Sequence, residues 1–582
     1  MGSIQEQGPK DGRQEANGVS PSADPILTRR KLKIVCIGAG FSGLTLSHKI
    51  QHEWKLEDVI DLQIYEKNAD VGGTWYENTY PGAACDIPAR EKFVPQGLLN
   101  PSLTLSSQTD AYTFLFEPNP DWSQFYPSQP EIQAYIKATV AKYNLDKYVS
   151  LKSKILETRW DDDAGKWQIK FDANGVVQED TADILVNGSG FLNKWKWPQI
   201  AGLHDFQGKL VHSAKWDNTY SWEGKKVAVI GNGSSGIQIV AAMQPKVSKL
   251  VTYIRNPTWI SINFCADKTT DGKNFTYTEE QRKAFRENPE AHFALRKELE
   301  ASVNGFFFGM KTGHPFQQGL EAACKAQMGT ILKDDPELAA KMIPAFHPGC
   351  RRLTPGDGYL EALQQPNARV CWSPITRVTE KGIETAEGEE EFDLIVCATG
   401  FDTSFVPSWK LVGLNGATLD ERWKTDPDAF FAVQVDTMPN YYMFNGPNCP
   451  ISHGSVLTEI SWTCDYILRW AQKIATQNIK SITPKPEAVA DFNEYSQEFL
   501  KNTVWADNCR SWYKNGKESG AVTGTYAGSI LHFKDGLENV GSEHFDIVWR
   551  SKNRFAWLGN GQSLWDKDGM GDMAYYMKNL KV

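Results

Sequence analysis

The stretch that decides the fold is KLKIVCIGAGFSG (residues 31–43), in which a short apolar run leads directly into three glycines. Such a run ending in glycine is typical of a buried strand in a parallel sheet. Glycines in the spacing GxGxxG let the chain turn tightly against a pyrophosphate, and the helix that follows offers free N–H groups to the anion. The stretch therefore predicts a strand over 33–37 and a phosphate-binding turn formed by Gly38, Gly40, Ser42 and Gly43.

An acidic residue follows this turn at the distance that a dinucleotide site requires. The apolar strand LQIYEK (62–67) carries Glu66, 23 residues after Gly43. A carboxylate at this place binds ribose hydroxyls and repels a 2′-phosphate. A glycine motif alone is weak evidence, and the alternative is a turn that binds nothing. The order of strand, glycines, helix, strand and acid is far more specific, and it predicts that the first unit binds FAD or NAD.

A second unit of the same design begins at KKVAVIG (225–231). Its strand KLVTYIRNP (249–257) carries Arg255 and Asn256 where the first unit has its acid. A guanidinium suits a 2′-phosphate, so this unit is expected to prefer NADP(H); the alternative is that Arg255 is an ordinary surface arginine. The residues expected around its pyrophosphate are Gly231, Asn232, Gly233, Ser234, Ser235 and Gly236.

Two nucleotide units in one chain indicate that electrons pass from NADPH through a bound flavin. Disulfide reductases of this design pass the electrons on to a CxxxxC pair, which the sequence lacks. Another acceptor is therefore needed, and dioxygen is the natural candidate.

The remaining apolar runs extend the pattern of a parallel fold. Residues 183–191 and 393–401 contain strands that end in glycine, residues 130–143 have helical spacing, and residues 275–345 look like a helical insertion. The predicted fold class is α/β, with two Rossmann-like dinucleotide-binding domains, for FAD and for NADP, and a helical insertion. The expected parts are a disordered tail (1–29), the FAD domain (30–195 and, with C-terminal loops, 391–582), the NADP domain (196–265 and 346–390) and the insertion (266–345).

The composition fits a globular enzyme and argues against several other classes. Lys and Arg number 62 against 71 Asp and Glu, a formal net charge of -9, which is unlike a nucleic-acid-binding surface. No stretch approaches 18 uninterrupted apolar residues and the N-terminus lacks the order of a signal peptide, so we expect no transmembrane segment and a cytoplasmic location. The ten cysteines form no CxxC pair, so reduced, mostly buried thiols and no metal site are expected.

Three further motifs are specific in combination. They are GGTWYENTYPGAACD (72–86), FQGKLVHSAKW (206–216) and ATGFD (398–402). Together they resemble GGxWxxxxYPGxxxD, FxGxxxHxxxW and ATGFD, the patterns of the type I Baeyer–Villiger monooxygenases, a family of class B flavoprotein monooxygenases. The resemblance spans about residues 32–530, and the size and style resemble those of fungal members in secondary metabolism. It implies an enzyme that uses FAD, NADPH and dioxygen to convert a small-molecule ketone to an ester or lactone.

The resemblance also implies roles for individual residues. Arg352 matches the catalytic arginine, whose fixed charge stabilises a reactive oxygen anion, and Asp86 matches the acid that holds this arginine and lies against the flavin. Arg351 matches a basic residue at the NADP phosphate, and Trp512 matches a tryptophan that closes over NADP. The expected flavin contacts of the segments around Asp86 are Gly73, Thr74, Trp75, Tyr76, Glu77, Asp86, Ile87 and Tyr112.

Each of these assignments has a purely structural alternative. Arg352 could form an ordinary salt bridge, Asp86 could cap a turn, and Trp512 could be one of 20 tryptophans packed in a core. His212 lies in the family's linker between the two nucleotide domains, so an interdomain hydrogen bond is expected of it ahead of a role as general base.

The chain departs from the family pattern in two places. Ala84 stands where many bacterial relatives have arginine, and about twenty extra residues (90–109) separate Asp86 from Tyr112. The extra segment is either a tolerated surface loop, since loop closure costs grow slowly with length, or an unspliced short intron. Two other functions stay open: an N- or S-oxygenating flavin monooxygenase, and a non-catalytic nucleotide-binding relative.

Overall fold

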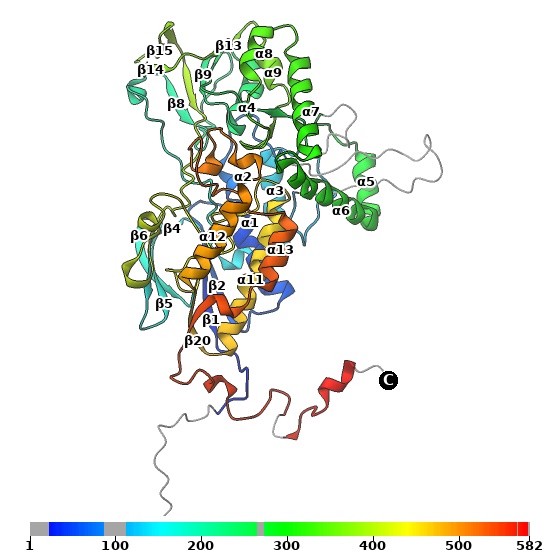
Figure 1. Ribbon diagram of the computed structural model, residues 1–582, viewed down its shortest axis with the longest axis vertical. Coiled ribbons are helices and arrows are strands. Elements are labelled where there is room, and N and C mark those ends of the chain that lie inside the picture. Colours follow the sequence, from blue (N-terminus) through cyan, green and yellow to red (C-terminus); the bar gives the residue numbers. More distant parts are fainter. Residues whose placement is uncertain (1–22, 87–111, 265–272, 567–568, 580–582) are drawn as a thin grey trace, which may run out of the picture.

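The computed structural model describes residues 23–86, 112–264, 273–566 and 569–579. Ile87, the extra segment 90–109 and residues 1–22 of the expected tail lie outside the described residues. Two lobes are stacked along the long axis of the molecule, and each is built around a five-stranded parallel sheet (Figure 1). The predicted α/β class, with two Rossmann-like units, is confirmed.

The sheet of the first lobe has the strand order β19-β7-β1-β2-β3. Successive residues of a strand point to opposite faces. Ile34 and Cys36 accordingly belong to the core that includes the helices α1 and α11, whereas Val35 and Ile37 pack against a separate four-stranded sheet. The elements are β1 (Leu32–Ile37), β2 (Ile60–Tyr65), β3 (Val149–Ser150), β7 (Ile184–Asn187), β19 (Tyr441–Met443), α1 (Phe41–His48) and α11 (Val456–Thr476).

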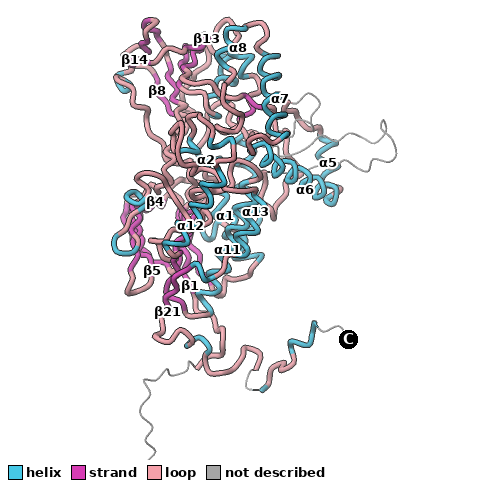
Figure 2. Tube along the Cα trace, in the orientation of Figure 1, coloured by secondary structure: helices cyan, strands magenta, loops and turns pink. Residues whose placement is uncertain are grey.

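The four-stranded sheet and several helices complete the first lobe. Its strands β18, β4, β5 and β6 lie side by side, and β4, β5 and β6 form an antiparallel meander (Figure 2). The predicted helix over 130–143 is confirmed as α3. The elements are β4 (Ser153–Asp161), β5 (Lys166–Ala173), β6 (Val176–Ala182), β18 (Lys410–Val412), α2 (Thr74–Glu77), α3 (Gln129–Tyr143), α10 (Leu419–Arg422), α12 (Pro486–Leu500), α13 (Ile530–Asn539) and the pair β20 (Ile479–Pro484) and β21 (Phe545–Trp549).

The sheet of the second lobe has the order β13-β10-β9-β17-β8, and all its strands are parallel. Val227 and Val229 face the core that contains α4, and Ala228 and Ile230 face the opposite core. The elements are β8 (Lys209–His212), β9 (Lys226–Ile230), β10 (Lys249–Tyr253), β13 (Ala368–Cys371), β17 (Leu394–Cys397), α4 (Ser234–Met243), α9 (Tyr359–Leu363), the short pair β11 (Ile260–Ser261) and β12 (Thr354–Pro355), and the meander β14 (Ile375–Val378), β15 (Gly382–Thr385) and β16 (Gly388–Glu391).

One expected boundary needs correction. The run 393–401 was assigned to the FAD domain, but its strand β17 lies between β9 and β8 in the second sheet. Hydrogen bonding between neighbouring strands outweighs sequence order here, so the second sheet continues to Cys397 and the boundary at 390 falls inside it.

Helices occupy most of the described part of the expected insertion. Pro occupies the first turn of three of them, and side chains of Thr278, Asn288, His314 and Asp335 accept hydrogen bonds from the first backbone N–H groups. The helices are α5 (Glu279–Glu287), α6 (Pro289–Gly305), α7 (Pro315–Ile331) and α8 (Pro336–Met342). Within the described residues, none of the helices combines the length and apolar character that a membrane crossing requires.

The cysteines differ from expectation at one pair. Cys350 and Cys509, 159 residues apart, form a disulfide, so the expectation of reduced thiols throughout is wrong. Spacing along the chain could not reveal this pair, because the fold alone brings the two residues together. The other described cysteines form no disulfide within the described residues and are buried: Cys36, Cys85, Cys324, Cys371, Cys397, Cys449 and Cys464.

Candidate active site

The first glycine turn lies between β1 and α1, where packing leaves no room for side chains. Gly38 has φ +106°, and a Cβ built on it would lie 2.7 Å from the carbonyl oxygen of Gly188. A Cβ on Gly43 would lie 2.3 Å from the carbonyl oxygen of Gly38. Gly40 is the N-cap of α1, so the free N–H groups of this helix open at the turn. The turn therefore has the form that a pyrophosphate requires.

The second glycine turn, between β9 and α4, repeats this geometry. Gly231 has φ +112°, and a Cβ on it would lie 2.4 Å from the carbonyl oxygen of Ala398. A Cβ on Gly236 would lie 2.3 Å from the carbonyl oxygen of Gly231. Gly233, the N-cap of α4, has open space where its side chain would be. Two equivalent anion cradles are thus present, one in each lobe.

Several polar residues predicted at the cradles have protein partners. The Asn232 side chain donates to the carbonyl of Asn256 (2.9 Å), and Ser234 Oγ lies 2.7 Å from Thr354 Oγ1. Ser235 hydrogen-bonds the hydroxyl of Tyr80. These contacts fix the entrance of the second cradle. The predicted cofactor contacts of Asn232, Ser234, Ser235 and Asn256 stay predictions.

Glu66 lies directly after β2 and faces the first cradle. Its carboxylate accepts hydrogen bonds from the backbone N–H groups of Ala39 (2.9 Å) and Asn68 (2.8 Å). Burial raises the pKa of Glu66, and these two bonds oppose the rise. Ser42 is buried in the first turn of α1. Glu77 forms an ion pair with Lys67 (2.7 Å), which anchors α2 beside this strand.

A cavity of about 210 Å³ lies where the two lobes meet. It brings together residues from motifs that are far apart in the sequence, including two of the predicted charged site residues. Apolar and aromatic side chains form most of the remaining wall. The lining residues are Trp75, Ala84, Cys85, Asp86, Tyr112, Phe264, Val303, Phe306, Arg352, Ile451, Ser452, His453, Gly454 and Val456.

Two aromatic residues from opposite sides of the extra segment meet at this cavity. Trp75 Nε1 donates a hydrogen bond to the hydroxyl of Tyr112 (3.1 Å), and the two ring centroids lie 5.5 Å apart. Gly73, just before α2, packs closely against the first glycine turn, since a Cβ on it would lie 3.0 Å from the Cα of Gly40. Thr74 is exposed and Tyr76 half-buried next to them. Tyr112 therefore returns to the site despite the inserted residues.

Asp86 lies in the wall of the cavity, against α4 of the other lobe. Gln238 Nε2 donates to Asp86 Oδ1 (3.0 Å) and to the carbonyl of Ala84 (3.1 Å). Burial raises the pKa of Asp86 to about 6, and the charge of Arg352 and the Gln238 hydrogen bond both oppose the rise. No direct ion pair joins Asp86 and Arg352 in the described residues. The acid was expected to hold this arginine; here Gln238 is its hydrogen-bond partner, and the arginine acts on it through its charge.

Arg352 reaches the same cavity from the segment that follows α8. Its guanidinium donates to the carbonyl of Ile451 (3.4 Å) and also lies near the hydroxyl of Tyr513. Burial raises the pKa of Tyr513 to about 12, while the arginine opposes the rise. Arg352 thus contributes a permanent positive charge to a largely apolar cavity.

Arg351 and Arg255 form a second positive site at the carboxyl end of β10. Arg351 Nη1 donates to the carbonyl of Pro257 (2.9 Å). Burial lowers the pKa of Arg351, and the nearby charge of Arg255 lowers it further. Arg255 is exposed and has no carboxylate partner among the described residues. Two neighbouring guanidiniums without a carboxylate between them suit a phosphate.

The structure places the other two candidates as follows. The ring of Trp512 stacks on Phe191, with centroids 5.6 Å apart, and is partly buried against the core of the second lobe. His212, at the end of β8, stacks on Trp195 (4.5 Å), and its Nε2 lies 3.2 Å from Thr399 Oγ1. Burial lowers the pKa of His212 to about 4. His212 does not line the cavity, which favours a structural role.

Three residues at the cavity were not predicted. Gln238 fixes Asp86, Tyr513 contacts Arg352, and His453 lines the wall with a pKa that burial lowers to about 3. Gln238 follows the second glycine turn by two positions, but no spacing rule connects it to Asp86. The ring of His453 stacks on Trp505 and is tilted against Phe307, and the places of these residues in the chain carry no signal of either contact.

The arrangement combines two anion cradles, a positive pair beside one of them, and an apolar cavity between the lobes that holds one fixed cation and one acid. Such a site can hold two dinucleotides, exclude water from an uncharged substrate, and stabilise negative charge on a reacting oxygen.

Comparisons with known proteins agree with this geometry. The family described as flavin-binding monooxygenase-like matches residues 31–271. The FAD-binding monooxygenase tazF of Aspergillus terreus is 49% identical over 96% of this chain and 96% of its own length. A Baeyer-Villiger monooxygenase of Streptomyces coelicolor is 31% identical over 89% of this chain and 93% of its own length. The crystal structure of cyclohexanone monooxygenase from Rhodococcus sp. Phi1 bound to NADP+ has a TM-score of 0.74 at 24% identity, covering 90% of this chain and 100% of that one.

Proposed function

The chain belongs to the flavin-binding monooxygenases, in the group that includes the Baeyer–Villiger monooxygenases, and from that premise we propose that it inserts one oxygen atom of dioxygen beside a ketone carbonyl. The product is an ester or a lactone. The chain is an NADPH-dependent flavoprotein monooxygenase with FAD as its bound cofactor.

The observation that carries this proposal is the position of Arg352. Its guanidinium lines the cavity between the two cradles together with Asp86, Trp75 and Tyr112. The predominantly apolar wall lowers the local dielectric, so a permanent cation there interacts strongly with a developing negative charge. Loss of one preorganised donor at an oxyanion typically costs roughly 3–4 kcal/mol of transition-state stabilisation.

The first cradle fits FAD. Gly38 and Gly43 leave no space for side chains, Gly40 opens the N-terminus of α1, and Glu66 stands where ribose hydroxyls are bound. The flavin ring would then lie toward Trp75 and Tyr112 in the cavity wall. Bound FAD, reduced by NADPH, supplies the activation of dioxygen. The protein's part is to orient the ring, exclude water and hold the charges around it.

The second cradle fits NADPH. Its pyrophosphate would lie at Gly231, Gly233 and Gly236, and its 2′-phosphate at Arg255 and Arg351. Trp512, at the start of a short 3-10 helix in the C-terminal part, would cover the nicotinamide half. These roles follow from the two-arginine arrangement and from the resemblance of this segment to the family pattern.

Arg352 and Asp86 have different electrostatic roles in the cavity. Arg352 would stabilise negative charge on an oxygen atom beside the ketone carbonyl. Asp86, fixed by Gln238, would partly balance the arginine's charge. His212 does not line the cavity, so no role as a base is proposed for it.

We also propose the class of substrate and the setting. Phe264, Val303, Phe306 and Ile451 give the cavity an apolar wall, which suits a ketone with a hydrophobic body. Several similar proteins are fungal FAD-binding monooxygenases, which supports a role in secondary metabolism. Dioxygen and this ketone are the expected small-molecule partners, with no nucleic acid, and we propose that the enzyme acts in the cytoplasm.

The test is turnover by purified FAD-loaded protein with NADPH, using linear, cyclic and polyketide-like ketones. Fragment masses must place the added oxygen between the carbonyl carbon and a neighbouring carbon. A sulfide and a tertiary amine form a separate arm, because all three products gain one oxygen in total mass. Sulfoxide or N-oxide without ester would contradict the proposal and favour heteroatom oxygenation.

A further inference from the structure

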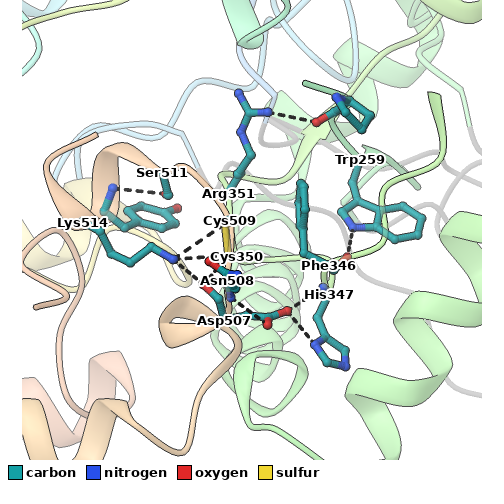
Figure 3. The surroundings of a disulfide bond; sticks show 12 residues. Trp259, Phe346, His347, Cys350, Arg351, Asp507, Asn508, Cys509, Ser511 and Lys514 are labelled. Atoms are coloured by element: carbon teal, nitrogen blue, oxygen red, sulfur yellow. Dashed lines mark hydrogen bonds and ion pairs between the residues drawn. A yellow bond between two sulfur atoms is a disulfide. The ribbon is translucent and has the colours of Figure 1, made fainter. Parts of the chain in front are cut away.

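A disulfide links the two segments that carry the charged and aromatic site residues. Cys350, bonded to Cys509 (Figure 3), is followed in the sequence by Arg351 and Arg352, and Cys509 precedes Trp512 by three residues. Residues 507–516 are called the Trp512 segment below. The crosslink therefore fastens the Trp512 segment to the arginine segment at a point adjacent to both proposed cofactor contacts.

A buried lysine stands beside both sulfur atoms. Lys514 is fully buried, and its Nζ lies 3.7 Å from Cys350 Sγ and 3.9 Å from Cys509 Sγ (Figure 3). The same ammonium donates to the carbonyl of Asp507. A cation at this distance stabilises a thiolate, which makes either cysteine a better leaving group when the disulfide is attacked.

The free thiols of the described residues have different surroundings. Burial raises the pKa of Cys36 and of Cys397 to about 12. Such thiols stay protonated and unreactive at neutral pH. Cys350 and Cys509 differ from these two thiols, because a lysine ammonium lies beside both of their sulfur atoms.

The Trp512 segment keeps other attachments when the crosslink is open. The backbone N–H and the Nδ1 of His347 both lie within hydrogen-bond distance of Asp507 Oδ2 (2.9 and 2.8 Å). Cys350 Sγ also lies 3.3 Å from the carbonyl of Asp507, a distance at which the free thiol can donate a hydrogen bond. Opening the disulfide would therefore loosen the segment without unfolding the lobe.

The two cysteines differ in their neighbours. Both are buried, but Cys509 lies between the exposed residues Asn508 and Arg510, whereas neither neighbour of Cys350 is exposed. A small movement of residues 508–510 would uncover Cys509 while Cys350 stays beside Lys514.

We propose that Cys350–Cys509 is a reversible redox site, opened by a cellular dithiol and closed by hydrogen peroxide, that sets how firmly the Trp512 segment is held. A thiolate of the dithiol attacks Cys509 Sγ, the S–S bond breaks, and Cys350 leaves as a thiolate beside Lys514. The second thiol of the reductant attacks the mixed disulfide and releases Cys509. Two electrons pass to the protein, each cysteine ends with one proton, and the reductant leaves as its disulfide. Hydrogen peroxide reverses the change by taking two electrons and forming two waters.

The consequence for catalysis rests on the proposed function. With the crosslink closed, the Trp512 segment stays on the second lobe; with it open, the segment samples positions away from NADP. The reduced enzyme is expected to waste more NADPH as hydrogen peroxide per ester formed than the oxidised enzyme.

The test uses full-length FAD-loaded protein equilibrated in buffers of reduced and oxidised dithiothreitol. Acid quenching, alkylation and peptide mass spectrometry give the redox state of each cysteine, and brief trypsin treatment of parallel samples reports cleavage after Arg510 and Lys517. Cys350 and Cys509 are expected to become alkylated together as the buffer becomes reducing, while the free thiols Cys36, Cys397 and Cys464 are alkylated equally in every buffer. Cleavage after Arg510 should be slow in the oxidised form and become a leading cut in the reduced form.

Matched variants separate the parts of the proposal. Lys514→Met should slow reduction by dithiol about fivefold to tenfold through the poorer leaving group, and the exposed control Lys501→Met should not. The double variant Cys350→Ser/Cys509→Ser should show the reduced cleavage pattern in every buffer.

Three results would overturn the proposal. They are alkylation of both cysteines in peroxide-treated protein, a crosslink that survives excess dithiol until the protein unfolds, and identical trypsin patterns in the two states. Failure of the proposed function looks different: no ester would form in either redox state, while the thiol and trypsin readouts would still decide the redox site.

Discussion

Gln238 and Asp86 connect the two lobes through a single hydrogen bond, 3.0 Å from the amide nitrogen of one to the carboxylate of the other. Gln238 lies on the helix that begins at the second cradle, and Asp86 ends the motif that begins at the first. The same amide group also holds the carbonyl of Ala84, so the acid is fixed in both position and orientation. The charge balance around Arg352 thus depends on a residue of the NADP-binding unit.

The first prediction concerns the pH dependence of this contact. Burial holds the pKa of Asp86 near 6, and the Gln238 hydrogen bond keeps it from rising further. The carboxylate fraction falls as pH drops through about 6, so ester formation per NADPH should fall over the same range. Gln238→Leu removes the bond and should move this inflection to higher pH. An unchanged profile of ester against pH would show that Asp86 does not control the cavity charge.

The second prediction concerns the choice of nicotinamide. Arg255→Ala should raise the KM for NADPH about 10- to 150-fold and leave that for NADH nearly unchanged, because a charged hydrogen bond contributes roughly 1.5–3 kcal/mol. Initial-rate kinetics with both nucleotides measure this. The control is Lys226→Ala. Lys226 is an exposed lysine at the first residue of β9, the end of the strand that lies away from the second glycine turn. Equal losses for the two nucleotides would contradict the phosphate role of Arg255.

The third prediction separates packing from binding in the second cradle. Gly236→Ala places a methyl group 2.3 Å from the carbonyl of Gly231, so it should lower the free energy of unfolding by about 1–3 kcal/mol. Gly233→Ala enters open space at ordinary backbone angles and should leave stability unchanged while weakening NADPH binding. Denaturant unfolding and nucleotide titration of both variants check this. Equal stability of the two variants would mean that the close approach at Gly236 is not a constraint.

The sequence predicted those parts of the fold that depend on neighbours along the chain. The apolar runs ending at Gly38 and Gly231 identified two strands, two turns and the helices after them, because strand, glycine and helix are local features. The two cradles turned out to be equivalent even in the carbonyl groups that their glycines face, Gly188 and Ala398.

Other features depend on contacts that chain order does not encode. The Gln238–Asp86 bond joins residues 152 positions apart, and the Cys350–Cys509 disulfide joins residues 159 apart. The sequence pattern places β17 in the FAD domain, whereas the strand belongs to the second sheet. An apolar run that ends in glycine has the same pattern in either sheet, so the pattern does not distinguish between them. The family resemblance identified Arg352 and Asp86 and implied a direct contact between them. In the structure the side-chain amide of Gln238 contacts Asp86 instead.

The proposed charge stabilisation by Arg352 is tested most directly by turnover in isotope-labelled dioxygen. We expect wild-type enzyme to place one labelled atom in the ring or chain oxygen of the ester. Arg352→Ala should keep bound FAD, seen by its visible absorbance, and still oxidise NADPH, but form labelled ester at least about 100-fold more slowly. Arg377→Ala, an exposed arginine on β14, is the control. Labelled ester at a near wild-type rate from Arg352→Ala would contradict the account.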